Sequence, residues 1–266
     1  MDNSELVRTV ILDVSKAFDP VSHDILIAEL SKYHTSSTAI NWFRSYLSEC
    51  KHVCSVYGVL SCPASLDRGV PQGSTLGPLL SSVYMNDLPF ILKETEVYIY
   101  ADDTTIWSSG TNYTKIQQTL NMNLGEANRW FELNEMKHWN TEKTKHLLIG
   151  IAKNPSNCEK IALELSIDNG RLEESVGEKL LGVVIDANPS WDLQIDYLIK
   201  KLNSRICLLK RAKAHLSIKC RKMIYNVLGK PIVEYCWTVW GNYSVGNLER
   251  LFRQQKLCVR LILDAT

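Results

Sequence analysis

The chain has 266 residues, 45% of them hydrophobic, so it is long enough to bury a substantial core and should be globular. Its formal net charge of +1 indicates no charged partner when it is taken over the whole chain. The charge is uneven, however: residues 200–266 hold fourteen Lys and Arg against three acidic residues, a net +11, which leaves −10 for residues 1–199. This division is typical of proteins in which Lys and Arg follow a phosphate backbone while carboxylates hold metal, although a solvated helical surface explains the same charges.

The eight cysteines are scattered and include no C-x-x-C pair, so we expect an intracellular protein, in the nucleus or the cytoplasm, and not a secreted disulfide scaffold. Residues 1–7 lack the apolar run of a signal peptide, and no segment has the length and hydrophobicity of a membrane span. Cys50, His52 and Cys54 alternate as zinc ligands on a strand could, but no fourth ligand is near in sequence, and ordinary strand residues are the better interpretation.

The first hundred residues mix strands and helices. An apolar, β-branched run at 7–14 predicts a buried strand with Asp13 at its exit. Apolar residues at helical spacing predict a helix at 22–33 behind an N-cap serine, a second at 38–47 and a third at 75–92. Paired strands are expected at 53–60 and 64–70.

The later elements suggest a change of architecture. Strands at 97–101 and 104–108 flank a tight turn at Asp102 and Asp103, because Asp tolerates turn geometry. A long helix follows at 113–136, then strands at 145–149, 161–167, 171–173 and 180–185, the middle two joined by a turn at 168–170. From residue 191 the pattern is helical, with basic helices at 191–214 and 218–228. This order predicts an α+β fold: an antiparallel sheet with helices on one face in residues 1–187, then a helical, basic region in residues 188–266.

Three aspartates can converge in this layout. Asp102 and Asp103 would lie at the tip of a hairpin, and Asp13 would end an adjacent strand. Carboxylates so close together repel unless one takes up a proton or the set binds Mg²⁺, which prefers oxygen ligands. Two such ions would activate a 3′-hydroxyl and neutralise a leaving pyrophosphate. An isolated Asp-Asp pair is weak support, since most are turns.

Three stretches, in this order, closely resemble signature motifs of the reverse transcriptases of non-LTR (LINE-type, jockey-like) retrotransposons: LDVSKAFDPVSHDIL (12–26), RGVPQGSTLGPLL (68–80) and YADDT (100–104). LNEMKHWNTEKT (133–144), LLGVVIDANPSW (180–191) and VWGNYSVGNLERLFRQQKLCVRLI (239–262) look like that family's later motifs, so the likeness spans nearly the whole chain. The resemblance implies an RNA-directed DNA polymerase that uses two Mg²⁺ ions, or Mn²⁺, with an RNA template, a DNA primer and dNTPs, and without a membrane.

The resemblance also implies roles for single residues. Asp13, Asp102 and Asp103 match the metal-binding aspartates, and Lys143 falls where the family has a lysine proposed to protonate the leaving pyrophosphate. The nucleotide-binding positions match Phe18, Arg68, Gln72 and Gly73.

Phe18 matches the bulky side chain beneath the sugar, which excludes a 2′-hydroxyl by its volume; a plain core residue is the alternative. The strand at 180–186 matches the primer grip. Basic residues of the following thumb helices would hold the template–primer duplex through its phosphates, with Lys200, Lys201, Arg205, Lys210 and Arg211 as the candidates.

Several features depart from the family. Only twelve residues precede Asp13, where the family has a fingers region, so we expect a palm with partial fingers elements at 1–187, a thumb at 188–266, and fingers that are largely absent or supplied by a partner chain. Ser81 and Ser82 stand where the family has bulky apolar residues. A catalytically inactive, retrotransposon-derived nucleic-acid-binding remnant is therefore a second hypothesis. A palm-like nucleotide cyclase is a third, and it has no place for RGVPQGS.

Overall fold

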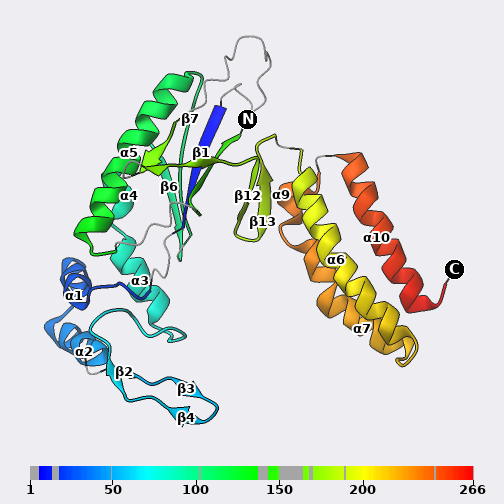
Figure 1. Cartoon of the computed structure of the whole chain (residues 1–266), viewed down its shortest axis with the longest axis horizontal. Helices are drawn as coiled ribbons and strands as arrows, with labels where there is room; N and C mark the ends of the chain where they lie inside the picture. Colours follow the sequence, from blue (N-terminus) through cyan, green and yellow to red (C-terminus); the bar gives the residue numbers. More distant parts are fainter. Residues whose placement is uncertain are drawn as a thin grey trace. The chain divides into compact units, whose positions relative to one another are not determined.

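The computed structural model describes residues 6–13, 18–48, 50–101, 103–136, 143–149, 164–167, 170–188, 190–242 and 244–265 (Figure 1). The chain divides into two compact units. The sheet unit lies within residues 2–146 and 154–174, and the helical unit lies within residues 147–153 and 175–266. The fold is mixed α+β. Within the described ranges, no helix has both the length and the hydrophobicity needed to cross a membrane.

The main sheet has five strands in the order β11-β8-β1-β7-β6. Their bounds are Leu6–Asp13 for β1, Glu96–Tyr100 for β6, Asp103–Gly110 for β7, Lys145–Ile149 for β8 and Glu173–Glu174 for β11. β7 runs antiparallel to both β1 and β6, but β11 runs parallel to β8. The prediction of a purely antiparallel sheet is therefore wrong at this edge. Parallel neighbours need a crossover of a dozen or more residues, and the connection from β8 to β11 is long enough to supply it.

That connection contains a small hairpin of its own. Strands β9 (Ser166–Ile167) and β10 (Gly170–Arg171) pair antiparallel. The hairpin agrees with the predicted turn between two strands, and residues 168 and 169 of that turn lie outside the described residues, as do residues 161–163 of the predicted strand.

The apolar side chains at the end of β1 show which face of the sheet is covered by the core. Val10 and Leu12 are fully buried, together with Ile106 opposite Val10 on β7. They join a core to which helix α5 (Tyr113–Leu133) contributes Leu120. In Figure 1, α5 lies along one side of β6, β7 and β1. Successive strand residues point to opposite faces, so burial of Leu12 turns Asp13 to the other face.

Four further helices belong to the sheet unit: α1 (His23–Lys32), α2 (Ser37–Leu47), α3 (Gly77–Met85) and α4 (Leu88–Ile91). The prediction of one helix at 75–92 is wrong, because the chain breaks between α3 and α4. Pro89 lies in the first turn of α4, where its missing N–H is harmless; inside a continuous helix it would remove a backbone hydrogen bond. Ser22 occupies the N-cap of α1, but its side chain makes no capping bond.

Residues 51–65 form two nested ladders rather than two long strands. β2 (Lys51–His52) pairs with β5 (Ala64–Ser65), and β3 (Ser55–Val56) pairs with β4 (Val59–Leu60). The predicted strand at 53–60 is therefore wrong. Tyr57 and Gly58 both have positive φ, 49° and 81°, and this pair of left-handed residues reverses the chain.

The helical unit begins with a hairpin that the sequence concealed. β12 (Gly177–Leu180) and β13 (Val183–Asp186) are antiparallel and are joined by Leu181 and Gly182. Positive φ at both residues, 47° and 87°, is the signature of a type I′ turn. The single strand predicted at 180–185 is therefore wrong. It and the primer-grip stretch at 180–186 correspond to the end of β12, a turn and β13.

Five helices complete this unit: α6 (Asp192–Lys213), α7 (Ile218–Leu228), α8 (Lys230–Glu234), α9 (Trp237–Trp240) and α10 (Val245–Leu263). Leu198 and Leu202 lie one turn apart on α6 and pack in a core with Leu251 of α10. The basic helices predicted at 191–214 and 218–228 are confirmed as α6 and α7. The division into palm and thumb at residue 187 stays a prediction.

Candidate active site

Two predicted metal ligands are neighbours on the sheet. Asp13 ends β1, Asp103 begins β7, and the antiparallel register places them directly opposite each other. Opposed residues in such a pair project from the same face, with Cα atoms about 4.5–5.5 Å apart. Since Leu12 points into the core, this face is the one turned away from α5. Adjacent carboxylates repel, so the arrangement favours a bound cation.

Tyr100 pairs with Asp103, so β6 and β7 form a hairpin in which two residues of the chain separate the strands. Ala101 has a φ of 54°, a left-handed conformation that costs a non-glycine residue about 1–2 kcal/mol. Asp102 itself lies outside the described residues.

A lysine from a distant part of the chain reaches the first carboxylate. The Nζ atom of Lys143 lies 3.6 Å from Oδ2 of Asp13. The next residue, Thr144, is fully buried, and its hydroxyl accepts a hydrogen bond of 3.4 Å from the N–H of Asp13. This bond ties the chain just before β8 to the end of β1. The structure therefore places both Asp103 and Lys143 beside Asp13, and their roles in catalysis stay predictions.

The carboxylate pair suits a hard divalent cation. Oδ2 of Asp13 is buried and accepts no hydrogen bond from the described residues. Carboxylate oxygens are the ligands that Mg²⁺ prefers, and Mg²⁺ completes its shell with water and phosphate oxygens. Among the described residues, no group of three or more His, Cys, Asp or Glu could hold a metal ion, and that includes the alternating Cys50, His52 and Cys54. Asp102 is not among the described residues, so a third carboxylate ligand stays a prediction.

The glycine-containing loop at 68–73 is fixed against the segment that follows β1. The N–H of Gly69 donates to Val21 O at 2.8 Å, and the N–H of Val70 donates to Phe18 O at 3.0 Å. A Cβ on Gly69 would lie 2.9 Å from Asp19 O, and its φ is +86°, so only glycine fits here. This close approach brings two segments that are 50 residues apart in sequence into one cluster.

The side chain of Gln72 is fixed to the residue that follows Phe18. The amide of Gln72 donates to Oδ1 of Asp19 at 2.8 Å. Phe18 is partly buried and packs against the core. Gly73 has a φ of +78° with open space around it, so the backbone conformation, and not crowding, favours glycine.

Arg68, which was predicted to bind the nucleotide, forms an ion pair with a carboxylate. Its guanidinium lies 2.7 Å from Oε2 of Glu135, and both side chains are about half exposed. Arg68 also pairs with Ser22 through an isolated β-bridge. The structure thus places Arg68 at the junction of the loop and the end of α5, and its role in binding nucleotide stays a prediction.

Sequence reasoning missed Tyr84, the residue that joins these segments. Its hydroxyl accepts from the N–H of Ser22 at 3.3 Å and donates to Asn134 O at 2.7 Å. Burial raises the pKa of Tyr84, which keeps the hydroxyl available as a donor. The sequence shows Tyr84 only as one more residue of an apolar stripe, so no local pattern marks it.

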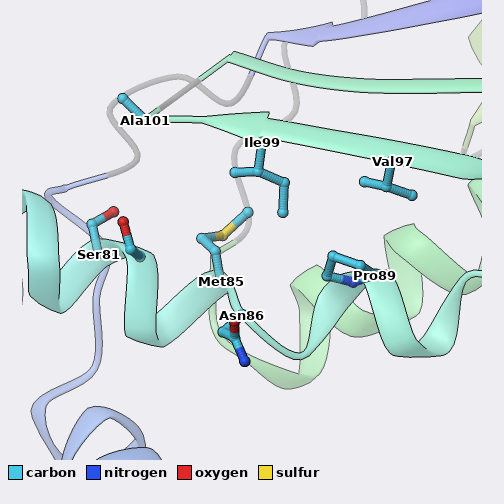
Figure 2. A pocket seen from close by; sticks show the side chains of 8 residues that line it. Ser81, Met85, Asn86, Pro89, Val97, Ile99 and Ala101 are labelled. Carbon is cyan, nitrogen blue, oxygen red and sulfur yellow. The ribbon is translucent and has the colours of Figure 1, made fainter.

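A groove of about 240 Å³ runs between the helix side of β6 and helices α3 and α4 (Figure 2). Val97, Ile99 and Ala101 line it from the strand, and Ser81 and Ser82 line it from α3. The groove is therefore bordered by the two serines that stand where the resemblance leads one to expect bulky side chains, and it reaches Ala101 in the turn of the hairpin.

The predicted nucleic-acid contacts all belong to α6, in the helical unit. Four of the five side chains are exposed, and Arg205 is half buried with an Nε that has no partner in the described residues. The exposed four are Lys200, Lys201, Lys210 and Arg211.

Comparison with known proteins places the chain among polymerases. The family model described as "Reverse transcriptase (RNA-dependent DNA polymerase)" matches residues 3–202. The RNA-directed DNA polymerase from mobile element jockey of Drosophila melanogaster is 27% identical over 276 residues, which is all of this chain and 29% of the relative. The probable RNA-directed DNA polymerase from transposon BS of the same organism is 24% identical over 99% of this chain and 30% of the relative. The chain thus spans about 30% of the length of these curated relatives.

Solved structures with a similar arrangement include telomerase from Candida albicans in complex with the TWJ fragment of telomeric RNA. It has a TM-score of 0.48 and 12% identity over 96% of this chain and 48% of that one. The model match covers most of the chain, and the relatives include the mobile element jockey. The chain therefore belongs to the reverse transcriptase (RNA-dependent DNA polymerase) family and is a jockey-like non-LTR member of it.

Proposed function

We propose that this chain carries the polymerising centre of an RNA-directed DNA polymerase, which adds deoxynucleotides to the 3′-hydroxyl of a DNA primer on an RNA template. The observation that carries the proposal is the opposition of Asp13 and Asp103 across β1 and β7. Family membership supports the reaction class, and the carboxylate pair supports the place in the chain where it occurs.

Two Mg²⁺ ions, or Mn²⁺ in their place, would be held by Asp13, Asp103 and the predicted ligand Asp102. When bound, such ions neutralise charge on the phosphates and lower the pKa of the attacking hydroxyl. The antiparallel ladder fixes the spacing of the carboxylates, so the ligands need little rearrangement to accept the metal.

Lys143 would act on the leaving group. Its ammonium lies 3.6 Å from Asp13, and a phosphate bound at the carboxylates would come within reach of it. There the ammonium would neutralise the pyrophosphate or give it a proton.

The cluster of Phe18, Gln72 and Gly73 would form the nucleotide side of the site. Phe18, anchored through its backbone carbonyl, would exclude a 2′-hydroxyl by volume. The Gln72 amide, oriented by Asp19, can hydrogen-bond a sugar or base without bringing a charge. Arg68 could turn from Glu135 to the triphosphate, since its ion pair is partly exposed and therefore weak.

The template–primer duplex would contact the exposed basic residues of α6 through its phosphates, with little dependence on sequence. In this proposal residues 1–187 are the palm with partial fingers elements and residues 188–266 the thumb. The remaining fingers surface would come from elsewhere in a longer polypeptide or from a partner chain.

Primer extension tests the proposal. A labelled DNA primer on an RNA template is incubated with Mg²⁺, dNTPs and either the wild type or Asp103→Asn. We expect the variant to lose about 100-fold or more of the extension rate, because a metal ligand that acts on the transferred phosphate is removed. Glu126→Gln, on an exposed face of α5, is the matched control and should extend like the wild type.

Equal extension by the wild type and Asp103→Asn would overturn the assignment of the site. Folded wild type that binds the duplex but never extends the primer would leave the second hypothesis, an inactive nucleic-acid-binding remnant.

A further inference from the structure

Helix α10 has two adjacent apolar stripes, and its own unit buries only one of them. The inner stripe packs against α6 through Leu251, Cys258 and Ile262, which are all buried. The outer stripe consists of Val245, Leu248, Phe252, Gln255, Val259 and Leu263. Its four most exposed apolar side chains, those of residues 245, 252, 259 and 263, are between 46% and 77% exposed. A helix that packs on a single core needs only one apolar stripe, so the second indicates a further packing partner.

The outer stripe has the spacing of a coiled-coil seam. Val245, Leu248, Phe252, Gln255 and Val259 are separated by three, four, three and four residues. This spacing keeps the side chains in line along one side of the helix, where a second helix can pack against all of them. Since α10 has 19 residues and is therefore about 28 Å long, the seam extends over most of its length.

A groove of about 250 Å³ lies beside this seam. Trp237 of α9 lines it from one side, and Val245, Leu248, Phe252 and Gln255 are among the residues of α10 that line it from the other. Trp237 is itself 41% exposed, so the groove is open to side chains from outside the unit. A helix placed along the outer stripe would insert side chains into the groove.

Two opposite charges flank the outer stripe. Glu249 and Lys256 directly follow Leu248 and Gln255, so both occupy the same flanking position of the seam. If two α10 helices pack antiparallel with Phe252 of each facing Gln255 of the other, Glu249 of each copy comes beside Lys256 of the other. The pairing then occurs twice. A parallel pair in register would bring identical residues level with one another and would not form these pairs.

Within one chain, Glu249 and Lys256 make surface contacts that exchange easily. An oxygen of Glu249 lies 3.9 Å from the guanidinium of Arg253, and both side chains are mostly exposed. The Nζ atom of Lys256 lies 4.5 Å from the ring centroid of Phe252. Exposed contacts of these two kinds contribute about 1 kcal/mol or less, so both side chains are available to a partner helix.

We propose that α10 is a dimer interface, on which α10 of a second copy of the chain binds antiparallel along the outer stripe. Val259 of each copy would pack on Leu248 of the other and enter the groove beside Trp237. Because both copies use the same surface, the contact closes as a two-fold dimer. A single helix pair buries less than the roughly 800 Å² per partner of a standard interface, so we expect a dissociation constant of about 10 μM.

Sedimentation equilibrium of the full chain tests the interface, from about 1 μM to about 100 μM protein. The wild type should pass from one chain to two over this range. Phe252→Glu places a charge in the middle of the seam and should weaken association about 30-fold or more, with an unchanged melting temperature because the side chain is exposed. Phe90→Glu, at a 78% exposed aromatic position of α4, is the matched control and should dimerise like the wild type.

Two charge reversals test the antiparallel arrangement. Glu249→Lys and Lys256→Glu each replace two pairs of opposite charge by two pairs of like charge, so each should weaken self-association about 10-fold. An equimolar mixture of the two variants should associate again with about the wild-type affinity. The reason is that one variant then carries only positive flanking charges and the other only negative ones.

A wild type that stays monomeric at every concentration would overturn the proposal, and would fit a stripe that another part of a longer polypeptide covers. Dimers that persist in Phe252→Glu would also overturn it, since they form through another surface. If the mixture of the two reversed variants associates no better than either alone, the antiparallel pairing is refuted. Association is measured without nucleic acid or nucleotide, so none of these results bears on the proposed polymerase activity.

Discussion

The hairpins β6–β7 and β12–β13 share one backbone feature, a turn residue with positive φ, but the surroundings of that residue differ. Each closes with a two-residue turn that contains a non-glycine residue at positive φ, Ala101 at 54° and Leu181 at 47°. At β12–β13 the strain is secured by a tertiary contact, because the Tyr235 hydroxyl donates to Leu181 O at 2.6 Å. At β6–β7 the strained residue instead borders a groove on one side and precedes the aspartates. A strained backbone residue that a tertiary hydrogen bond holds in place, such as Leu181, serves the structure. A strained residue next to carboxylates, such as Ala101, is typical of a reactive site.

The side chains on the strands of the two hairpins also differ in charge. The first hairpin places Asp103 opposite Asp13, and two adjacent carboxylates favour a bound cation. The second places Lys179 beside the ring of Tyr197, which Lys201 also contacts, so two positive charges surround one aromatic ring.

Lowering the pH should give the largest difference between the two hairpins, because it should destabilise the sheet that carries β6–β7 and leave β12–β13 unchanged. His146 of β8 is buried in the sheet that carries β6–β7, and burial, assisted by the charge of Arg8, lowers its pKa to about 4. The unfolded chain takes up the proton near pH 6.5 and the folded chain only near 4, so stability is fully present above 6.5 and is lost as the pH falls toward 4, by roughly 3 kcal/mol. Amide exchange of β7 and β13 at pH 7 and pH 5 should show a loss of protection concentrated in β7.

His146→Leu should abolish most of that loss, while His215→Gln, at an exposed position of the helical unit, should not. The same loss of β7 protection in His146→Leu and the wild type would refute the explanation.

Gly182→Val should break the second hairpin. A Cβ at this position would lie 3.2 Å from Cε1 of Tyr235, and the φ of +87° is unfavourable for any β-branched residue. We expect the helical unit to lose about 2 kcal/mol in urea unfolding. Gly246→Val, where the nearest atom is 3.9 Å away, should cost clearly less, and equal losses for the two variants would contradict the type I′ turn.

Leu181→Asn should instead stabilise the second hairpin. The change creates Asn-Gly, the pair that type I′ turns favour, and the Leu181 side chain is 43% exposed, so little burial is lost. A gain of about 1 kcal/mol in the unfolding free energy is expected. Leu216→Asn, at a similarly exposed position without positive φ, should give no gain; a gain there of the same size would show that surface polarity is the cause.

Ala101→Gly should produce the smallest change. Glycine removes the penalty of the left-handed conformation but adds entropy to the unfolded chain, which leaves a net gain of about 0.5 kcal/mol. Ala39→Gly, at a partly exposed position of helix α2, should lose stability instead. Thermal unfolding that shifts downward in both variants would show that Ala101 is not strained.

The two hairpins also show what sequence reasoning can reach. The strands of β6–β7 were predicted because Asp-Asp is a recognisable turn between β-prone runs, and the structure confirms them within one or two residues. The β12–β13 turn was missed because Leu181 is no turn signal and the stretch around it is continuously apolar. The contact that holds it comes from Tyr235, more than fifty residues away.

The candidate site also has features that the sequence predicted and features that it did not. The apolar run of β1 indicated that Asp13 ends a buried strand, and the expected layout allowed Asp13 and Asp103 to converge. The exact register that opposes them, and the approach of Lys143, depend on contacts across 90 and 130 residues, which the local sequence does not encode. Periodicity predicted α6 and α7 because their apolar stripes repeat every turn. It could not predict that Lys179 would join Tyr197, since the strand that carries Lys179 was not recognised.

The measurement that tests the central claim most directly is Mn²⁺ binding followed by electron paramagnetic resonance, on the wild type, the Asp13→Asn/Asp103→Asn double variant and the Glu126→Gln control. The account predicts saturable binding by the wild type and the control, and binding more than about 100-fold weaker in the double variant, because carboxylate ligands are replaced by neutral amides. Equal Mn²⁺ affinity in the double variant and the wild type would contradict it, and would mean that the carboxylates opposed across β1 and β7 are not the metal site.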